Sequence, residues 1–129
     1  MLRFIHAADL HLGSPARGVN ALPGKVRQLL LDAPFKAYDL LIETAIAKKV
    51  DFLLLAGDLF DQANPSLKAQ VQFITGMAKL NEAGIKAYIC LGNHDPAPGT
   101  GLLRELPPNV HLFSHLHVER IPFVREGKV

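Results

Sequence analysis

The stretch VDFLLLAGDLFD, residues 50–61, contains an apolar run that ends in two aspartates three residues apart. Residues 52–56 are all apolar, which is typical of a strand in the middle of a parallel sheet covered on both faces. Gly57 ends the run, and Asp58 and Asp61 follow it. The sequence therefore predicts a central strand that places two carboxylates just beyond its carboxyl end.

Two further apolar segments, residues 2–8 and 86–91, are predicted to be strands of the same sheet. Between the first two strands, residues 34–49 carry apolar side chains at steps of three and four. This spacing predicts a helix with Asp32 as its candidate N-cap. A shorter helix is expected just before it, at residues 26–30.

Another helix is predicted between the second and third strands. Residues 64–66, with the sequence NPS, offer a capping side chain and a proline for its first turn, and Gly84 ends it. Its expected buried face consists of Leu67, Val71, Ile74 and Ala78. Strands and helices that alternate at this spacing predict right-handed crossovers. We therefore expect an α/β fold with a doubly wound, largely parallel sheet and helices on both faces.

The composition fits one globular domain. The chain has 129 residues, of which 49% are hydrophobic and 20% charged, which excludes a disordered or fibrous protein. No stretch is long and apolar enough to span a bilayer, and the first residues lack the pattern of a signal peptide. The single cysteine, Cys90, cannot form an internal disulfide. A cytoplasmic location is expected.

The net charge of +2 is too small to indicate a nucleic-acid partner by itself. Four of the 12 acidic side chains, Asp9, Asp58, Asp61 and Asp95, follow predicted strands and are candidates for one site. When these four are set aside, 8 acidic and 14 basic side chains remain, so the rest of the surface is mildly positive. Such an excess is equally typical of ordinary solvated charge.

Polar clusters follow all three predicted strands. The clusters are Asp9-Leu10-His11, Gly57-Asp58-Leu59-Phe60-Asp61 and Gly92-Asn93-His94-Asp95. Any one of them could be a simple turn, because aspartate and asparagine beside glycine are common turn formers. In open parallel sheets, however, ligands bind beyond the carboxyl ends of the strands, where all three clusters are expected. Their convergence favours a binding site.

The residue types in these clusters indicate metal ions. Aspartates crowded into one crevice would repel one another, and cations relieve that repulsion. Oxygen and imidazole ligands without thiolate favour Mn, Mg, Fe or Zn in an open site. A carboxylate between two ions makes a two-metal site, the arrangement used to hydrolyse phosphate esters. Asp58, on the central strand, is the natural bridge.

The same motifs resemble the first three signatures of the calcineurin-like metallophosphoesterases in order and spacing. Within that superfamily, FIHAADLHLG at residues 4–13 and LLLAGDLFD at residues 53–61 resemble the DNA-repair exonuclease branch, the SbcD-type nucleases. The resemblance implies a metal-dependent phosphodiesterase that acts on DNA as an exonuclease or endonuclease of DNA repair. It also implies a pair of divalent ions as cofactors, with manganese as the first choice.

The resemblance implies a role for each matched residue. Asp9 and His11 would hold one ion, Asp58 would bridge the pair, and Asn93 would bind the second ion. These four alone give each ion two protein ligands, so metal affinity should be weak and the activity of this chain alone is an open question.

The catalytic residues implied by the resemblance are His94 and Asp61. His94 would face the scissile phosphate and stabilise its charge or protonate the leaving oxygen. Asp61 would accept a hydrogen bond from His94 and fix its orientation. Gly57 and Gly92 would let the backbone turn sharply close to the ions.

Two more polar residues near these motifs have alternative interpretations. His6, on the first predicted strand, is either a satisfied core histidine or a support for a metal ligand. Asp95 either bonds to the backbone of its own turn or belongs to the site.

The chain departs from the family after residue 95. Relatives complete the site with a histidine and a Gly-His-x-His element on later strands, whereas the later histidines here are His111, His115 and His117, with Ser114 in place of the glycine. We expect these histidines to bind no metal.

The C-terminal region is expected to contain two short strands, at residues 110–113 and 117–123. Residues 126–129 resemble a turn at the start of a further strand. We therefore expect the chain to be the N-terminal part of a longer catalytic domain.

Two alternative functions remain open on the sequence alone. One is the same chemistry on a small phosphoester, such as a cyclic nucleotide. The other is a non-catalytic scaffold of the same fold. By resemblance, the implied partners besides DNA are an ATPase subunit and a second copy of the chain. No interaction with a membrane is expected.

Overall fold

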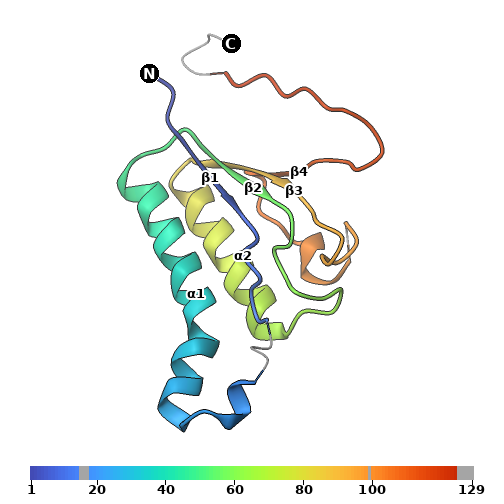
Figure 1. The fold of residues 1–129 in the computed structure, drawn as a ribbon. Helices are drawn as coiled ribbons and strands as arrows, with labels where there is room; N and C mark the ends of the chain where they lie inside the picture. The colour runs from blue at the N-terminus through green and yellow to red at the C-terminus, as the bar shows by residue number, and fades with distance from the viewer. Residues whose placement is uncertain (15–17, 99, 125–129) are drawn as a thin grey trace.

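The computed structural model describes residues 1–14, 18–98 and 100–124 (Figure 1). The elements in chain order are β1 (Phe4–Ala8), the 3₁₀ turn η1 (Val19–Ala21), α1 (Gly24–Ala47), β2 (Phe52–Ala56), α2 (Leu67–Glu82), β3 (Lys86–Cys90), the 3₁₀ turn η2 (Gly101–Arg104) and β4 (Val110–Leu112). The α/β class is confirmed. Neither helix of the described part is long and apolar enough to cross a membrane.

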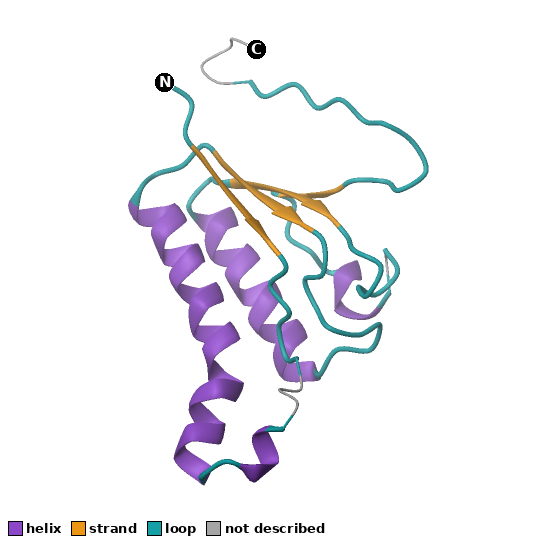
Figure 2. Cartoon of the chain, viewed as in Figure 1, coloured by secondary structure: helices purple, strands orange, loops and turns teal. Residues whose placement is uncertain are grey.

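The four strands form one parallel sheet in the order β1-β2-β3-β4. Each crossover moves one strand along in the same direction, and right-handed crossovers of that kind place their helices on the same face. Figure 2 shows α1 and α2 together on one side of the sheet. The helices of the described part therefore cover one face, and not both as expected. All four strands end at the same edge of the sheet.

Side chains of β2 alternate between the two faces of the sheet. Leu53 and Leu55 face the helices and are 0% and 1% exposed, whereas Phe52 and Leu54 lie on the other face and are half-buried. The irregular C-terminal segment covers part of that outer face, since its Phe123 ring packs 5.3 Å from the ring of Phe52, whereas Phe4 and His6 of β1 are exposed. The apolar run of β2 thus packs against helices on one face and is partly covered by a loop on the other.

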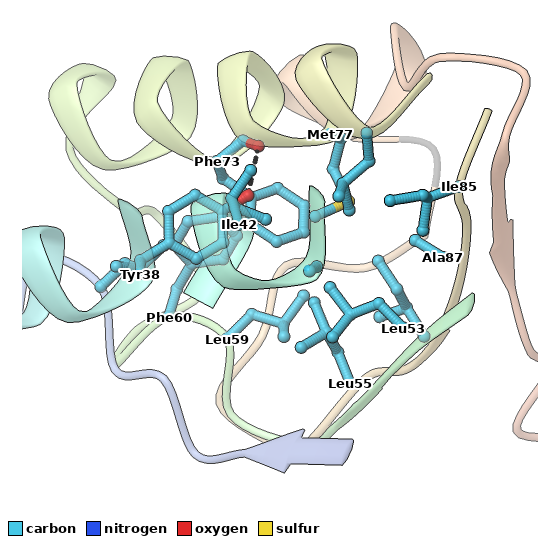
Figure 3. Packing of buried hydrophobic residues seen from close by; sticks show 14 of the residues in the cluster. Tyr38, Ile42, Leu53, Leu55, Leu59, Phe60, Phe73, Met77, Ile85 and Ala87 are labelled. Carbon is cyan, nitrogen blue, oxygen red and sulfur yellow. Dashed lines mark hydrogen bonds between the residues drawn. The ribbon is translucent and has the colours of Figure 1, made fainter. Parts of the chain in front are cut away.

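The core lies between the sheet and the two helices (Figure 3). Tyr38 of α1 lies across α2 and donates a hydrogen bond of 2.7 Å to the carbonyl of Phe73. A side chain at Gly76 would clash with the Tyr38 ring, so this glycine lets the helices approach closely. The two helices therefore pack as a pair against β2 and β3.

The first helix is continuous, which corrects the prediction of two separate helices. Pro34 lies inside α1, although a proline in a helix interior removes one backbone hydrogen bond. Asp32 is consequently not an N-cap. It accepts hydrogen bonds from Gln28 at 2.9 Å and from Lys68 of α2 at 3.3 Å.

The second helix begins two residues later than a start capped by Asn64, and a different face is buried. Its N-cap is Ser66, whose hydroxyl accepts a 3.2 Å bond from the amide of Ala69. Leu67 and Val71 are 70% and 49% exposed, so the predicted buried face was wrong. The buried residues are Ala69, Phe73, Gly76, Met77 and Leu80. Gly84 ends the helix as predicted, with a left-handed φ of 71°.

Of the two strands expected near the C-terminus, one forms. β4 pairs with β3, but residues 117–123 form no strand, and of this segment the ring of Phe123 packs against Phe52 on the outer face of the sheet. The turn expected at residues 126–129 lies outside the described residues.

Candidate metal centre

The loops after β1 and β2 are hydrogen-bonded to each other along their length. At distances of 2.9–3.3 Å, backbone amides of the first loop donate to carbonyls at the end of β2 and in the second loop: Asp9 to Ala56 and Gly57, His11 to Asp58, and Leu12 to Leu59. The parallel pairing of the strands thus continues beyond the sheet. Polar side chains of both loops are held at fixed positions as a result.

Three candidate ligands have a left-handed backbone conformation. The φ angles are 52° at Asp9, 45° at His11 and 37° at Asp58. Among the described residues, Lys49 is the only other non-glycine residue with a positive φ. Such a conformation costs a non-glycine residue about 1–3 kcal/mol and is concentrated at functional sites.

The side chains of these three residues meet at one point. Ligand atoms of Asp9, His11 and Asp58 all lie within 4.8 Å of one another. Two carboxylates at this separation repel each other unless a cation lies between them. A donor set of two carboxylates and one imidazole suits a divalent ion of the Mn, Fe or Zn type. The residues present therefore fit a metal ion.

The third loop lies directly against Asp58. A side chain at Gly92 would collide with the carboxylate and the backbone nitrogen of Asp58. The ring Nδ1 of His94 lies 3.1 Å from Asp58 Oδ2, and the His94 amide donates a longer bond of 3.4 Å to Oδ1. Asn93 lies between Gly92 and His94 in the sequence, and its side chain is exposed. The structure thus brings His94 to Asp58, and Asn93 belongs to the same loop.

The hydrogen bond from the His94 ring holds the pKa of Asp58 below its ordinary value, although partial desolvation acts in the opposite direction. Asp58 is therefore ionised in the neutral range, as a carboxylate metal ligand must be.

Asp61 pairs with His11 and not with His94, which corrects its predicted contact. Its Oδ1 lies 2.9 Å from His11 Nδ1, and its Oδ2 accepts a 2.8 Å bond from the hydroxyl of Ser14. These two bonds, the one from Ser14 first, lower the pKa of Asp61. With Nδ1 occupied, Nε2 is the nitrogen of His11 that is available to a metal ion.

The pairing of the first two loops brings these side chains within reach of each other. Leu12 forms an isolated parallel bridge with Phe60, and in that register Asp61 lies opposite Gly13, so the His11 ring meets the Asp61 carboxylate diagonally across the two loops. Ser14 was missed in the sequence. Its spacing of three residues from His11 is the only sequence signal, and its amide donates to the His11 carbonyl at 3.1 Å.

Asp95 ties the third loop to the second. It is only 9% exposed, and its two oxygens accept bonds of 2.8 Å from the amides of Phe60 and Gly92. The bond to its own turn is present as expected, and the bond to Phe60 is an additional one. His6, in contrast, is exposed and thus not a core histidine.

The C-terminal histidines do not belong to the group of Asp9, His11 and Asp58. His111 Nε2 is 3.0 Å from Glu119 Oε2, while His115 and His117 are exposed. Among the described residues, Asp9, His11 and Asp58 form the only close group of three or more side chains of the histidine, cysteine or acidic types.

Comparison with known proteins agrees with this geometry. Residues 2–127 match the family described as calcineurin-like phosphoesterase. The chain is 45% identical over 127 residues to an uncharacterised metallophosphoesterase, YhaO, of Bacillus subtilis, covering 98% of this chain and 31% of that protein.

Two nuclease relatives are more distant. Identity is 36% over 121 residues with a subunit of the nuclease SbcCD of Rhodobacter capsulatus, covering 89% of this chain and 27% of the relative. Identity is 32% over 99 residues with the DNA double-strand break repair protein Mre11 of Methanosarcina mazei. This match covers 77% of this chain and 15% of the relative. The chain spans less than a third of the length of these relatives. It belongs to the calcineurin-like phosphoesterase family, whose members use divalent metal ions.

Proposed function

We propose that this chain carries part of the two-metal centre of a phosphodiesterase that acts on DNA, as an exonuclease or endonuclease of DNA repair. The observation that carries the proposal is the meeting of Asp9, His11 and Asp58 within 4.8 Å, with the loop of His94 hydrogen-bonded to Asp58. The similarity to the SbcCD nuclease and to Mre11 proteins supports DNA as the substrate.

In this proposal, Asp9 and His11 hold one ion, Asp58 lies between the two ions, and Asn93 serves the second. When bound, the ions stabilise the charge of the phosphoryl oxygens and make water a better nucleophile. Manganese is the proposed metal, and Mg, Fe and Zn share the same types of donor.

His94 is the proposed acid. Its side chain is 55% exposed and stands beside Asp58, so it can reach the leaving oxygen of a phosphate held at the centre. Asp61 is a positioning residue in this scheme. Because it bonds to His11 Nδ1, it orients a metal ligand, in place of the support for His94 that the sequence suggested.

Further ligands are proposed to come from residues outside this chain. The coverage of less than a third of each relative supports the interpretation that the chain is the N-terminal part of a longer catalytic domain. The name of the Rhodobacter relative, as one subunit of a nuclease, supports a partner protein. We propose an ATPase subunit in that role, a second copy of the chain as a further partner, and a cytoplasmic location.

Hydrolysis assays of the full-length protein with Mn²⁺ test the proposed function, because further metal ligands are proposed to come from outside this chain. The substrates are duplex DNA, bis(p-nitrophenyl) phosphate as a simple diester, and p-nitrophenyl phosphate as a monoester. We expect turnover of DNA and of the diester, and His94→Ala should lower the rate by about a hundredfold or more. The matched control is His6→Ala, since His6 is an exposed histidine on another part of the sheet.

The outcomes separate the alternatives. Turnover of the monoester alone would exclude the nuclease and favour a small phosphoester as substrate. Binding of Mn²⁺ by the protein without hydrolysis of any of the three would favour a scaffold.

A further inference from the structure

A cavity of about 410 Å³ lies beside the third loop of the candidate metal centre. Its walls include Leu91, Asn93 and Ala97 from the end of β3 and the loop after it, and Phe113, Ser114 and His115 from the segment after β4. We propose that this cavity binds the base and sugar of one nucleotide, next to the phosphate held at the metal centre. The proposal deepens the proposed function and rests on it.

The position of the cavity is the first argument. Gly92 and Asn93 line it, and Gly92 is packed against the carboxylate of Asp58. The cavity and the metal centre therefore share the third loop. In this proposal, a nucleotide whose phosphate is held near Asp58 and His94 would place its sugar and base in this cavity.

The chemistry of the walls is the second argument. None of the described residues that line the cavity is Lys or Arg, so it is poorly suited to a phosphate group. Its one carboxylate, Asp95, is already bonded to the amides of Phe60 and Gly92. A neutral ligand is therefore favoured.

The wall residues also match the two parts of a nucleoside. Phe113 is a half-buried aromatic ring, and Leu91 and Ala97 add apolar surface for a flat base. Asn93, Ser114 and His115 offer donors and acceptors to the base edge and the sugar hydroxyls. A cavity of this volume suits one small molecule and not a duplex.

Titration of the ¹⁵N-labelled chain with thymidine, followed by NMR and without added metal, tests the proposal. Thymidine should shift the amide signals of Asn93, Ala97, Ser114 and His115. The comparison ligands are deoxyribose 5-phosphate, which lacks the base, and p-cresol, which is aromatic but lacks base and sugar. Neither should bind at this cavity as tightly as thymidine.

Two variants test the walls. Phe113→Leu keeps an apolar side chain but removes the stacking surface, and should weaken thymidine binding about tenfold. Ala97→Leu fills the cavity from an exposed position and should weaken binding at least as much. The control is Ala83→Leu, which changes an exposed alanine at a second cavity, near the start of β3, and should leave thymidine binding unchanged.

Three results would overturn the proposal: thymidine shifts confined to other residues, equal affinity for p-cresol, or unchanged affinity in folded Ala97→Leu. Amide dispersion in the same spectra shows whether each variant is folded. Calorimetry with Mn²⁺ alone tests the metal centre separately. Loss of the proposed function therefore appears as absent Mn²⁺ binding, whereas failure of the nucleoside site appears in the metal-free titration.

Discussion

Asp58 is the residue at which the three loops of the metal centre meet. Its carboxylate lies near the ligand atoms of Asp9 and His11, bonds to the His94 ring, and leaves no room for a side chain at Gly92. Its pKa is lowered mainly by the bond from His94, so the proposed acid also favours the ionised form of the proposed bridging ligand. In the proposed function, one carboxylate would thus contact both the metal ions and the acid.

The partner of Asp61 leads to a prediction that separates two roles. Asp61→Asn should lower Mn²⁺ affinity about 10–100-fold, because the bond that orients His11 is weakened. Calorimetry measures the affinity, and Asp39→Asn, on α1, is the control carboxylate. If Asp61 instead oriented His94, Mn²⁺ affinity would stay constant while turnover fell.

This residue also shows what the sequence could not reveal. The motif places Asp61 three residues after Asp58, and either His11 or His94 could be its partner on that basis. The choice depends on how two loops pack that are 48 residues apart at Leu12 and Phe60, since their bridge brings the loop of His11 within reach of the Asp61 side chain. Register of this kind is set by tertiary packing and leaves no local pattern.

At the scale of the elements, the strands were predicted best because each is a short apolar run with polar residues after it. The helices were predicted less well. In α2, apolar residues occupy two adjacent stripes, and only contact with α1 and the sheet decides that Phe73 is buried and Val71 exposed. In α1, Pro34 was taken as a helix start, but a long packed helix tolerates the lost hydrogen bond.

The contact between the second and third loops leads to a second prediction. Gly92→Ala should destabilise the chain by about 1–3 kcal/mol, because the new methyl group collides with Asp58. Urea denaturation measures the free energy of unfolding. The control is Gly24→Ala, since Gly24 begins α1 with open space around its Cα, and this change should be neutral or stabilising.

Gly92→Ala should also reduce Mn²⁺ affinity, since Asp58 has to move. Unchanged stability and affinity in this variant would contradict the close approach of the two loops.

The C-terminal segment is held by Glu119, and its stability should depend on pH. The amide of Ser114 first, and His111 second, lower the pKa of Glu119 from its ordinary value of 4.5. A lowered folded-state pKa contributes stability above pH 4.5, which is lost as the pH falls through the folded-state value.

Glu119→Gln should therefore lose less stability than the unchanged chain between pH 6 and about pH 3. Thermal denaturation across this range is the measurement, and Glu105→Gln, an exposed glutamate before β4, is the control. An identical pH profile for Glu119→Gln and the unchanged chain would show that Glu119 does not hold the segment.

At the scale of the whole molecule, the sheet has a helical face and an outer face that the irregular segment covers in part. The expectation of helices on both faces came from the uninterrupted apolar run of β2. Such a run shows that both faces are covered, but not by what. Here Phe123 and Tyr88 pack against Phe52 on the outer face. The sequence thus predicted the layers near the helices and missed the covering of the other side.

Metal binding should stabilise the whole fold, because its ligands come from loops after two strands and a third loop lies on them. Mn²⁺ at about 100 times its dissociation constant should add about 2.7 kcal/mol and raise the melting temperature. Scanning calorimetry with and without Mn²⁺ measures the shift. Asp58→Asn should abolish it and Asp39→Asn should not. A shift that persists in Asp58→Asn would place the ion elsewhere.

The left-handed backbone at Asp9, His11 and Asp58 has a consequence for how the sequence can change. Glycine would adopt these angles without strain. At these three positions, stability therefore favours glycine, whereas metal binding requires aspartate or histidine. A chain selected only for resistance to heat would drift toward glycine there and lose its catalytic apparatus. Retaining aspartate and histidine at these positions means that the protein keeps its reactive groups at the expense of a more robust scaffold.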